Sequence, residues 1–418
     1  MKKLGGKGRA AVLALVLALG LPASAAPGDL DSSFGGDGVR VHDLNSGDPY
    51  FEQANDIALQ GRKILSAIAD GSDGLTAARF RANGARDPDF GTNGVVRLPL
   101  GVTSRAQTIA TQGRKILVGG FAEFAGNNRF AIARFRPGGA PDGEFGAGGY
   151  VVTPFGPGDA QINEIKVLGN DKIVAAGWTT VGAGNDIAIA RYGPNGGLDP
   201  SFSDDGKRTI DDRARDMALD LDLQRGRLVL TGISSGAAVG QPQFMLTVRL
   251  RSGGALDDSF SGDGIKQINV PISNDEDATA AVVTNRKIVV GGHSGGTSPD
   301  FTLARLDRAG RLDETFGGDG FVVVRMGSGN SSIRDLATHD GKILATGSAT
   351  RAATSTDFAL VRLKKSGRPD RSFGNRGRAF GDAGGADGLQ SLVVDRLGRY
   401  VAGGTTEEVN VVLMRFLD

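Results

Sequence analysis

The sequence predicts an all-β protein built from repeated four-stranded units, a β-propeller, and three observations support this fold class. One motif recurs along the chain at intervals of about 56 residues. Each interval has room for four short antiparallel strands separated by turn residues. The two ends of the chain hold complementary halves of the same motif.

The repeated motif is anchored on a phenylalanine. An aspartate lies three residues before it, a glycine lies four residues after it, and an arginine lies eleven residues before it in every copy except the first. One complete copy consists of Arg79, Asp87, Phe90 and Gly94. The phenylalanines of the successive copies are Phe34, Phe90, Phe145, Phe202, Phe260, Phe316 and Phe373. The motif therefore predicts seven units.

Each unit also shows four strand-like segments. A nearly continuous apolar run such as 130–135 ends near the arginine, as expected for a strand covered on both faces. A half-apolar segment such as 54–59 and a basic-then-apolar segment such as 114–118 are joined by a tight turn in each unit, clearest at Asp340-Gly341. A short strand such as 94–98 follows the glycine. Four antiparallel strands per unit, repeated several times, are typical of a propeller.

The chain ends predict that the ring closes. Arg415 has no aspartate eight residues after it and no phenylalanine eleven residues after it, whereas the motif residues Asp31, Phe34 and Gly38 have no arginine eleven residues before the phenylalanine. We therefore expect the N-terminal strand near residues 39–41 to complete the last blade of a seven-bladed ring. An open solenoid would instead end in atypical polar capping repeats.

The arginine and aspartate of the motif allow two interpretations. In the first, each arginine fork holds a carboxylate in a partly buried ion pair. In the second, the arginine binds loop carbonyls and the aspartate caps its own turn. The phenylalanine is expected to fill the space between neighbouring sheets, and the glycine is expected to adopt a positive φ.

The first 25 residues have the pattern of a secretory signal peptide. A basic start is followed by the apolar run 10–21 and by the small residues Ala23, Ser24 and Ala25. We expect residues 26–418 to form a single propeller that is secreted or periplasmic and has no transmembrane segment, because a twelve-residue apolar run is too short to span a bilayer. Removal of the signal peptide changes the formal net charge from +1 to −3, which argues against nucleic acid as a partner.

The strand and turn motifs resemble a known repeat family. The segments Leu312–Gly320, Gly341–Gly347 and Phe358–Arg362 are similar to the delta-60 repeat family, which comprises exported bacterial repeats classed as a β-propeller of unknown function. The resemblance covers essentially all of the chain after the signal peptide. It implies the propeller fold, and it implies no activity, substrate or cofactor.

Motifs typical of catalysis or metal binding are weak in this sequence. Two G-x-S-x-G segments surround Ser234 and Ser294, but neither is followed by the helix that a nucleophile elbow requires. His42, His293 and His339 occupy different positions of the repeat, so no metal-ligand spacing is formed. The sequence also has no cysteine. We therefore predict no catalytic residue, no cofactor site and no metal site.

One polar position per unit carries the only candidate binding residues. If the half-apolar strand lines a central channel, this position is acidic in four units, at Asp56, Glu164, Asp216 and Asp335. Such carboxylates can attract a cation or a polar ligand. The alternative is a hydrated channel that binds nothing.

The even length of the units bears on function, because no unit carries a long insertion or lid. We therefore expect a non-enzymatic binding or scaffold module for a protein, peptide or glycan at the cell envelope or outside the cell. The alternative is an extracellular polymer hydrolase or lyase that uses the acidic channel residues.

Overall fold

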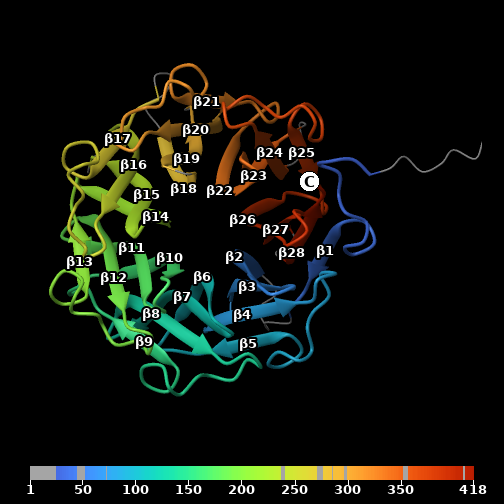
Figure 1. The fold of residues 1–418 in the computed structure, drawn as a ribbon. Helices are drawn as coiled ribbons and strands as arrows, with labels where there is room; N and C mark the ends of the chain where they lie inside the picture. Colours follow the sequence, from blue (N-terminus) through green and yellow to red (C-terminus); the bar gives the residue numbers. More distant parts are fainter. Residues whose placement is uncertain are drawn as a thin grey trace, which may run out of the picture.

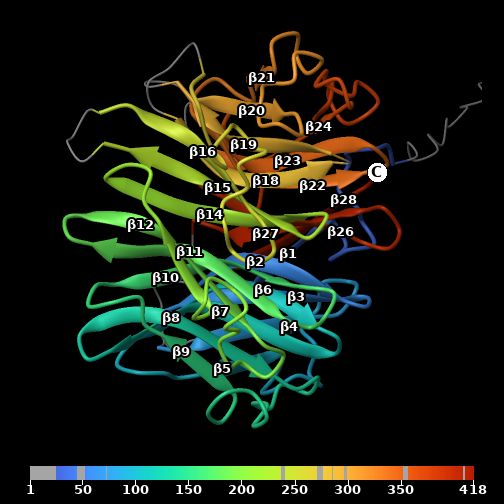
Figure 2. The ribbon, with the colours of Figure 1, turned by 60° about the vertical axis from the view of Figure 1, so that its left-hand side comes forward.

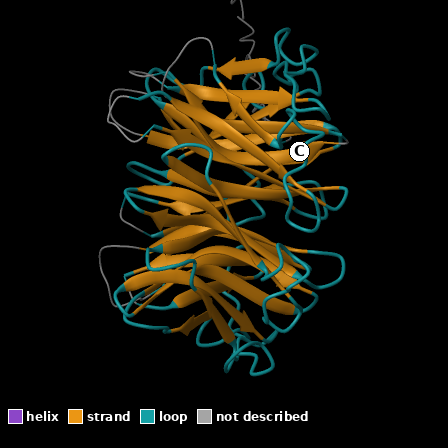
Figure 3. Ribbon diagram, turned by 90° about the vertical axis from the view of Figure 1, so that its left-hand side faces the viewer, coloured by secondary structure: helices purple, strands orange, loops and turns teal. Residues whose placement is uncertain are grey.

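The computed structural model describes residues 25–44, 52–71, 73–236, 241–270, 276–284, 286–295, 299–351, 356–407 and 410–418. Apart from Ala25, the predicted signal peptide lies outside these residues. The described residues form strands and loops, and Figure 3 shows the strands running through the whole depth of the molecule. Among these residues we find no helix with the length and apolarity that a membrane span requires.

The strands form antiparallel sheets arranged around a central axis (Figure 1). The innermost strands are β2 (Glu52–Gln60), β6 (Ser104–Gln112), β10 (Ala160–Val167), β14 (Arg215–Gln224), β18 (Glu276–Thr284), β22 (Ser331–His339) and β26 (Gly388–Val394). The strands next to them are β3 (Lys63–Asp70), β7 (Lys115–Phe124), β11 (Ile173–Val181), β15 (Arg227–Ser235), β19 (Lys287–Ser294), β23 (Lys342–Thr350) and β27 (Tyr400–Thr405).

Two further strands complete each unit toward the rim. The third strands are β4 (Leu75–Phe80), β8 (Asn127–Phe135), β12 (Gly184–Tyr192), β16 (Gln243–Leu250), β20 (Asp300–Leu306), β24 (Thr356–Leu363) and β28 (Val411–Phe416). The outer strands are β5 (Val95–Leu98), β9 (Tyr150–Thr153), β13 (Lys207–Ile210), β17 (Ile265–Ile268), β21 (Phe321–Val324), β25 (Arg378–Gly381) and β1 (Val39–His42). The predicted four-stranded antiparallel units are thus confirmed.

Hydrogen bonding groups these strands into five sheets of four and one sheet of eight within the described residues. The eight-stranded sheet consists of β10–β13 and β14–β17, which are joined by a single parallel pair between Asn185 and Arg215. Figure 2 shows these two groups splayed like the other neighbouring sheets. One pair of residues therefore links two otherwise separate four-stranded units.

The hydrophobic core lies between neighbouring sheets. The third strands are apolar and buried on both faces; every residue of β4 and β28 is buried. One cluster joins Leu65 and Leu75 of the β2–β5 sheet to Ile109 and Ile116 of the β6–β9 sheet. Sheet-on-sheet burial of this kind explains why the third strands read as continuous apolar runs.

The repeated motif joins each sheet to the next. Arg79 Nε lies 2.7 Å from Asp87 Oδ2, and the Arg79 guanidinium also donates to the carbonyl of Pro137 in the following sheet. Asp87 Oδ1 meanwhile accepts a hydrogen bond from a backbone N–H of its own turn. The two sequence interpretations therefore both hold. The arginine stacks 4.5 Å from the Phe90 ring centroid, and Gly94 has a φ of 90°.

The same contacts occur where the chain ends meet. Strand β1 pairs with β28 along its whole length, as Figure 1 shows, so residues from both ends of the chain share one sheet. Arg415 Nε lies 2.7 Å from Asp31 Oδ2, and its guanidinium stacks 4.7 Å from the Phe34 ring centroid. Gly38 has a φ of 94°, like the corresponding Gly94.

Candidate functional site

A β-bulge in every innermost strand shapes the centre of the molecule. In β2 the pairing register shifts between Ala54 and Asp56, so that Asn55 is the extra residue. The same shift occurs in the other innermost strands. A bulge turns two consecutive side chains toward the same side instead of alternating them. Each innermost strand therefore directs two neighbouring residues toward the axis.

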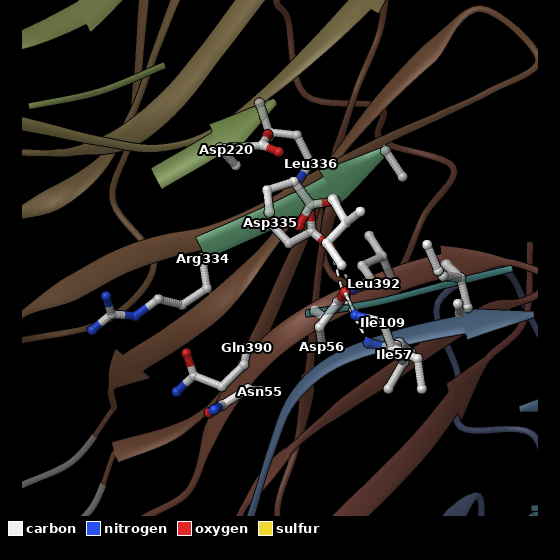
Figure 4. A pocket seen from close by; sticks show the side chains of 18 of the residues that line it. Asn55, Asp56, Ile57, Ile109, Asp220, Arg334, Asp335, Leu336, Gln390 and Leu392 are labelled. Carbon is white, nitrogen blue, oxygen red and sulfur yellow. Dashed lines mark hydrogen bonds between the residues drawn. The ribbon is translucent and has the colours of Figure 1, made fainter. Parts of the chain in front are cut away.

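These residues line a central pocket with a volume of about 860 Å³. The bulge residues form one level of its wall: Asn55, Gln107, Asn163, Leu219, Thr279, Arg334 and Gln390. The residues that follow them form a second level: Asp56, Glu164, Asp220, Ala280, Asp335 and Ser391. The buried Thr108 occupies the corresponding position in β6, the second innermost strand. Figure 4 shows residues of both levels projecting from β2, β22 and β26.

Three of the four predicted acidic residues lie at the second level, namely Asp56, Glu164 and Asp335. Asp216 does not, and its assignment is corrected here. It is fully buried near the start of β14, where its Oδ2 accepts the backbone N–H groups of Asp212 and Arg213. Asp220 occupies the second level in β14, because it directly follows the bulge residue Leu219. Asp216 lies four residues earlier in the strand, before the bulge.

The second level also holds neighbouring sheets together. Asp56 Oδ2 accepts the backbone N–H of Ile109 at 2.9 Å. Asp335 Oδ2 likewise accepts the N–H of Leu392 at 2.6 Å. Asp220 Oδ2 forms the same bond with Ala281. Each carboxylate thus accepts a hydrogen bond from the next innermost strand, and these acids contribute to the fold as well as to the pocket wall.

Two hydroxyl groups connect three of the carboxyls into one hydrogen-bonded chain. Thr108 Oγ1 lies 3.1 Å from Asp56 Oδ2 and 3.1 Å from Glu164 Oε2. Ser391 Oγ lies 2.8 Å from Asp56 Oδ1 and 3.2 Å from Asp335 Oδ2. A hydroxyl has only one proton to donate. All four contacts are satisfied when both hydroxyls donate to Asp56 while Glu164 and Asp335 carry protons and donate to the hydroxyls.

The electrostatic surroundings favour the same proton arrangement. Burial raises the pKa of Asp335 to about 7, and the negative charges of Asp220 and Asp56 add to this effect. Burial also raises the pKa of Glu164, against the opposing effect of Lys166, whose Nζ lies 2.7 Å from Glu164 Oε1. The pocket therefore contains carboxyl groups that can donate as well as accept hydrogen bonds near neutral pH.

The first level supplies polar groups with free hydrogen-bonding capacity on three consecutive innermost strands. Figure 4 shows Arg334, Gln390 and Asn55 extending side by side into the pocket. Asn55 Nδ2 donates to the carbonyl of Ala106, which leaves its Oδ1 facing the pocket. Among the described contacts, the side chains of Arg334 and Gln390 have no hydrogen-bond partner. This sector offers a guanidinium, two amides and, one residue deeper, two carboxyls and a hydroxyl.

Other residues with catalytic or metal-binding potential are placed elsewhere. Ser234 and Ser294 are buried, and their hydroxyls bond to Asp212 and Thr302 respectively. Within the described residues, the one group of three potential metal ligands that lie close together comprises His339, Asp340 and Asp418 at the molecular surface. None of these residues lines the central pocket.

Comparison with protein families gives matches over four segments, residues 114–145, 168–202, 284–316 and 339–373. The matching model is described as a domain of unknown function (DUF5122), a β-propeller. Each segment starts near the turn between the first two strands of a unit and ends at the motif phenylalanine. These matches support a β-propeller repeat family of unknown function. No curated protein matches the chain in sequence.

Several solved structures resemble the chain at low identity. The β-propeller domain of the Trilobed protease from Pyrococcus furiosus is 11% identical, with a TM-score of 0.44, and the alignment covers 87% of this chain and 95% of that one. Sqt1 from Chaetomium thermophilum, bound to the N-terminus of ribosomal protein L10, is 9% identical, with a TM-score of 0.47 and coverages of 87% and 84%. The polysaccharide lyase Uly1 is 9% identical, with a TM-score of 0.49 and coverages of 88% and 90%. Likeness of this degree carries no information on ligand or activity.

Sequence reasoning missed the first level of the pocket and Lys166. The bulge residues directly precede the polar position that the repeat did reveal, but a regular strand would point them away from the axis. The signal that could have found them is their composition: Asn55, Gln107, Asn163 and Gln390 are amides at one repeat position in an otherwise half-apolar strand.

Proposed function

We propose that this chain is an exported binding module whose residues 26–418 form a closed, seven-bladed ring of delta-60 repeats after removal of a signal peptide, residues 1–25. The signal-peptide pattern of residues 1–25 supports a secreted or periplasmic location. The pairing of β1 with β28 supports closure of the ring.

The proposed ligand is a glycan that enters the central pocket. The observation that carries this proposal is the polar sector on β22, β26 and β2, where Arg334, Gln390 and Asn55 offer unused donors and acceptors beside the carboxyl level. Sugar hydroxyls both donate and accept, so they match amides and carboxyls of mixed protonation. The pocket volume of about 860 Å³ is within the range of small-ligand sites.

Calorimetric titration with a panel of neutral and acidic oligosaccharides tests this proposal. We expect at least one to bind, with Arg334→Ala and Gln390→Ala each weakening affinity about fivefold or more, the loss expected for one or two hydrogen bonds. Leu219→Ala is the matched control, because Leu219 occupies the same bulge position on β14 without a polar group.

Two results would contradict the glycan proposal. One is the absence of binding by every saccharide in the panel, and the other is unchanged affinity in Arg334→Ala. A rise in melting temperature in millimolar Ca²⁺ or Mg²⁺ without any saccharide effect would instead identify the pocket as a cation site.

A hydrolase or lyase acting on an extracellular polymer is the second candidate. The observation that favours it is the position of Glu164 and Asp56 on either side of Thr108, where burial raises the pKa of Glu164 to about 8, since glycosidic cleavage uses a pair of carboxyl groups of which one acts as an acid. An enzyme would release new reducing ends from a polysaccharide, and Glu164→Gln would abolish release while keeping binding. A binding module would release none in either form.

A further inference from the structure

A cationic arc runs along one mouth of the central pocket. The turns that join the two inner strands of three consecutive sheets each carry an exposed arginine, at Arg396 between β26 and β27, Arg62 between β2 and β3, and Arg114 between β6 and β7. No carboxylate of the described residues lies within ion-pairing distance of these three guanidinium groups. Their charges are therefore available to a ligand.

The three arginines belong to one continuous surface. Gln60 Nε2 donates to the carbonyl of Arg114 at 2.8 Å, which ties the β2–β3 turn to the β6–β7 turn. A pocket of about 710 Å³ lies between these turns and is lined by Arg62, Lys63, Arg79 and Arg114, with no acidic residue in its wall.

A second, smaller pocket continues the surface on the other side of Arg62. Its wall contains Arg62, Arg396, Arg399 and Arg415, with Asp395 as its acidic residue. Asp395 is already occupied, because it accepts hydrogen bonds from the Leu397 and Arg399 backbone N–H groups and pairs with the Arg399 guanidinium. Lys63 and Arg79 are paired with Asp87, and Arg399 and Arg415 are paired with Asp31, so the cations of the two recesses that have no carboxylate partner are Arg62, Arg114 and Arg396.

The arc has limits on both sides. The turn between β10 and β11 carries Asp171, and the turn between β22 and β23 carries Asp340, both exposed. Arg396, Arg62 and Arg114 therefore lie on three consecutive turns between two turns that each carry an exposed aspartate, and this placement of one arginine per turn suits a chain-like ligand with regularly spaced negative charges.

We propose that Arg396, Arg62 and Arg114 bind an anionic polysaccharide, a polymer that carries sulfate or carboxylate groups on successive sugars. The recesses beside Arg62 contain aliphatic surface from Leu59 and the arginine stems, and neither wall contains an aromatic side chain. Single-stranded nucleic acid is normally held by aromatic stacking, which this surface does not offer. This surface borders the central pocket, since Leu59 and Thr111 belong to the walls of both, but its three arginines are not in the wall of that pocket, and either proposal can hold without the other.

The test is calorimetric titration of the full chain with a sulfated hexasaccharide and, separately, an oligogalacturonate. The first identifies sulfate groups and the second carboxylate groups as the recognised anions, and inorganic sulfate alone should bind far more weakly than either. We expect Arg62→Ala/Arg114→Ala to lower the affinity at least tenfold. Affinity should fall as salt is raised, because exposed charges are screened.

Arg225→Ala/Arg286→Ala is the matched control, because these exposed arginines occupy the corresponding turns between β14 and β15 and between β18 and β19. The affinity of this control should stay within twofold of wild type. Equal losses in the two double variants would overturn the proposal, since they would indicate a diffuse field. Tighter binding to single-stranded DNA or to phosphatidylglycerol vesicles than to either saccharide would also overturn it.

Discussion

At the scale of single residues, the motif aspartate performs two tasks with its two oxygens. Asp199 Oδ2 lies 2.6 Å from Arg191 Nε and 2.7 Å from Lys172 Nζ, while Oδ1 accepts from the Ser201 hydroxyl. The guanidinium of Arg191 also donates to the carbonyl of Ser252 in the next sheet. One carboxylate therefore positions both its own turn and the contact between sheets.

Replacing this aspartate should be strongly destabilising. Asp199→Ala leaves the buried Arg191 without its carboxylate, which should lower the free energy of unfolding by about 3–5 kcal/mol. Urea denaturation measures the loss. The control is Asp258→Ala, which removes an exposed ion pair with Arg251 and should cost less than about 1 kcal/mol. A loss from Asp199→Ala as small as that of the control would refute the structural role.

The buried carboxyls of the central pocket should make stability depend on pH in the opposite sense to the motif aspartates. Asp335 has a pKa of about 7 in the folded protein, above its value of about 4 in an unfolded chain. The folded state keeps a proton that the unfolded state releases, so this contribution is complete below pH 4 and is lost as pH rises through 7.

Asp335→Asn removes this titration. Between pH 5 and 8, the slope of the free energy of unfolding against pH should be less negative in the variant. The difference should correspond to the release of up to about one proton on unfolding, whatever the absolute stability of the variant. Urea denaturation at several pH values measures the slope, and Asp258→Asn should keep the wild-type slope. An identical slope in Asp335→Asn and wild type would show that Asp335 is ionised throughout this range.

At the scale of elements, the β-bulge of six of the seven innermost strands lies opposite a glycine in the neighbouring strand. A Cβ at Gly232 in β15 would lie 1.9 Å from the carbonyl oxygen of Met217. Glycines stand opposite the bulge in the other sheets as well, at Gly120, Gly177, Gly292, Gly347 and Gly404. The exception is Ile68, opposite the bulge of β2. Close backbone approach therefore accounts for part of the high glycine content.

Gly232→Ala should accordingly destabilise the protein. The backbone of β14 must move to accept the new methyl group, which should cost about 1–3 kcal/mol. Gly253→Ala is the control, because a Cβ there meets nothing within 4 Å and the residue has no positive φ. Thermal unfolding of the two variants compares them, and an equally small change in both would show that the bulge relaxes without strain.

At the scale of the whole molecule, contacts between residues at opposite ends of the chain unite the first and last sheets. The backbone N–H of Ile57 donates to Ser391 Oγ, and the carbonyl of Ala82 accepts from the Arg415 guanidinium. The segment before Asp31 also continues the loop that Arg415 begins: the Gly28 N–H donates to the Leu417 carbonyl, as Gly139 does to Arg136 in the second unit. The last sheet is therefore assembled from both ends.

Removing β1 should impair the entire fold. A variant that starts at residue 43 exposes the unpaired edge of β28 and leaves Arg415 without Asp31. We expect it to aggregate, because a free apolar edge strand pairs with other chains. Size-exclusion chromatography and thermal melting measure this outcome against a control that starts at Pro27. A monomeric variant that melts like the control would show that β1 contributes little to the ring.

The sequence by itself determined the four-stranded antiparallel units and their repetition, because apolar runs, turns and motif spacing are local properties of the chain. Asp56, Glu164 and Asp335, which the sequence predicted at the centre, line the pocket in the structure. The tertiary structure decided which side chains form the rest of the pocket, since each bulge breaks the two-residue alternation of the strand. In β14 the residue that follows the bulge and lines the pocket is Asp220, whereas Asp216 lies before the bulge. The tertiary structure alone also brought Arg62, Arg114 and Arg396 together, because adjacency of separate turns depends on how the sheets pack around the axis.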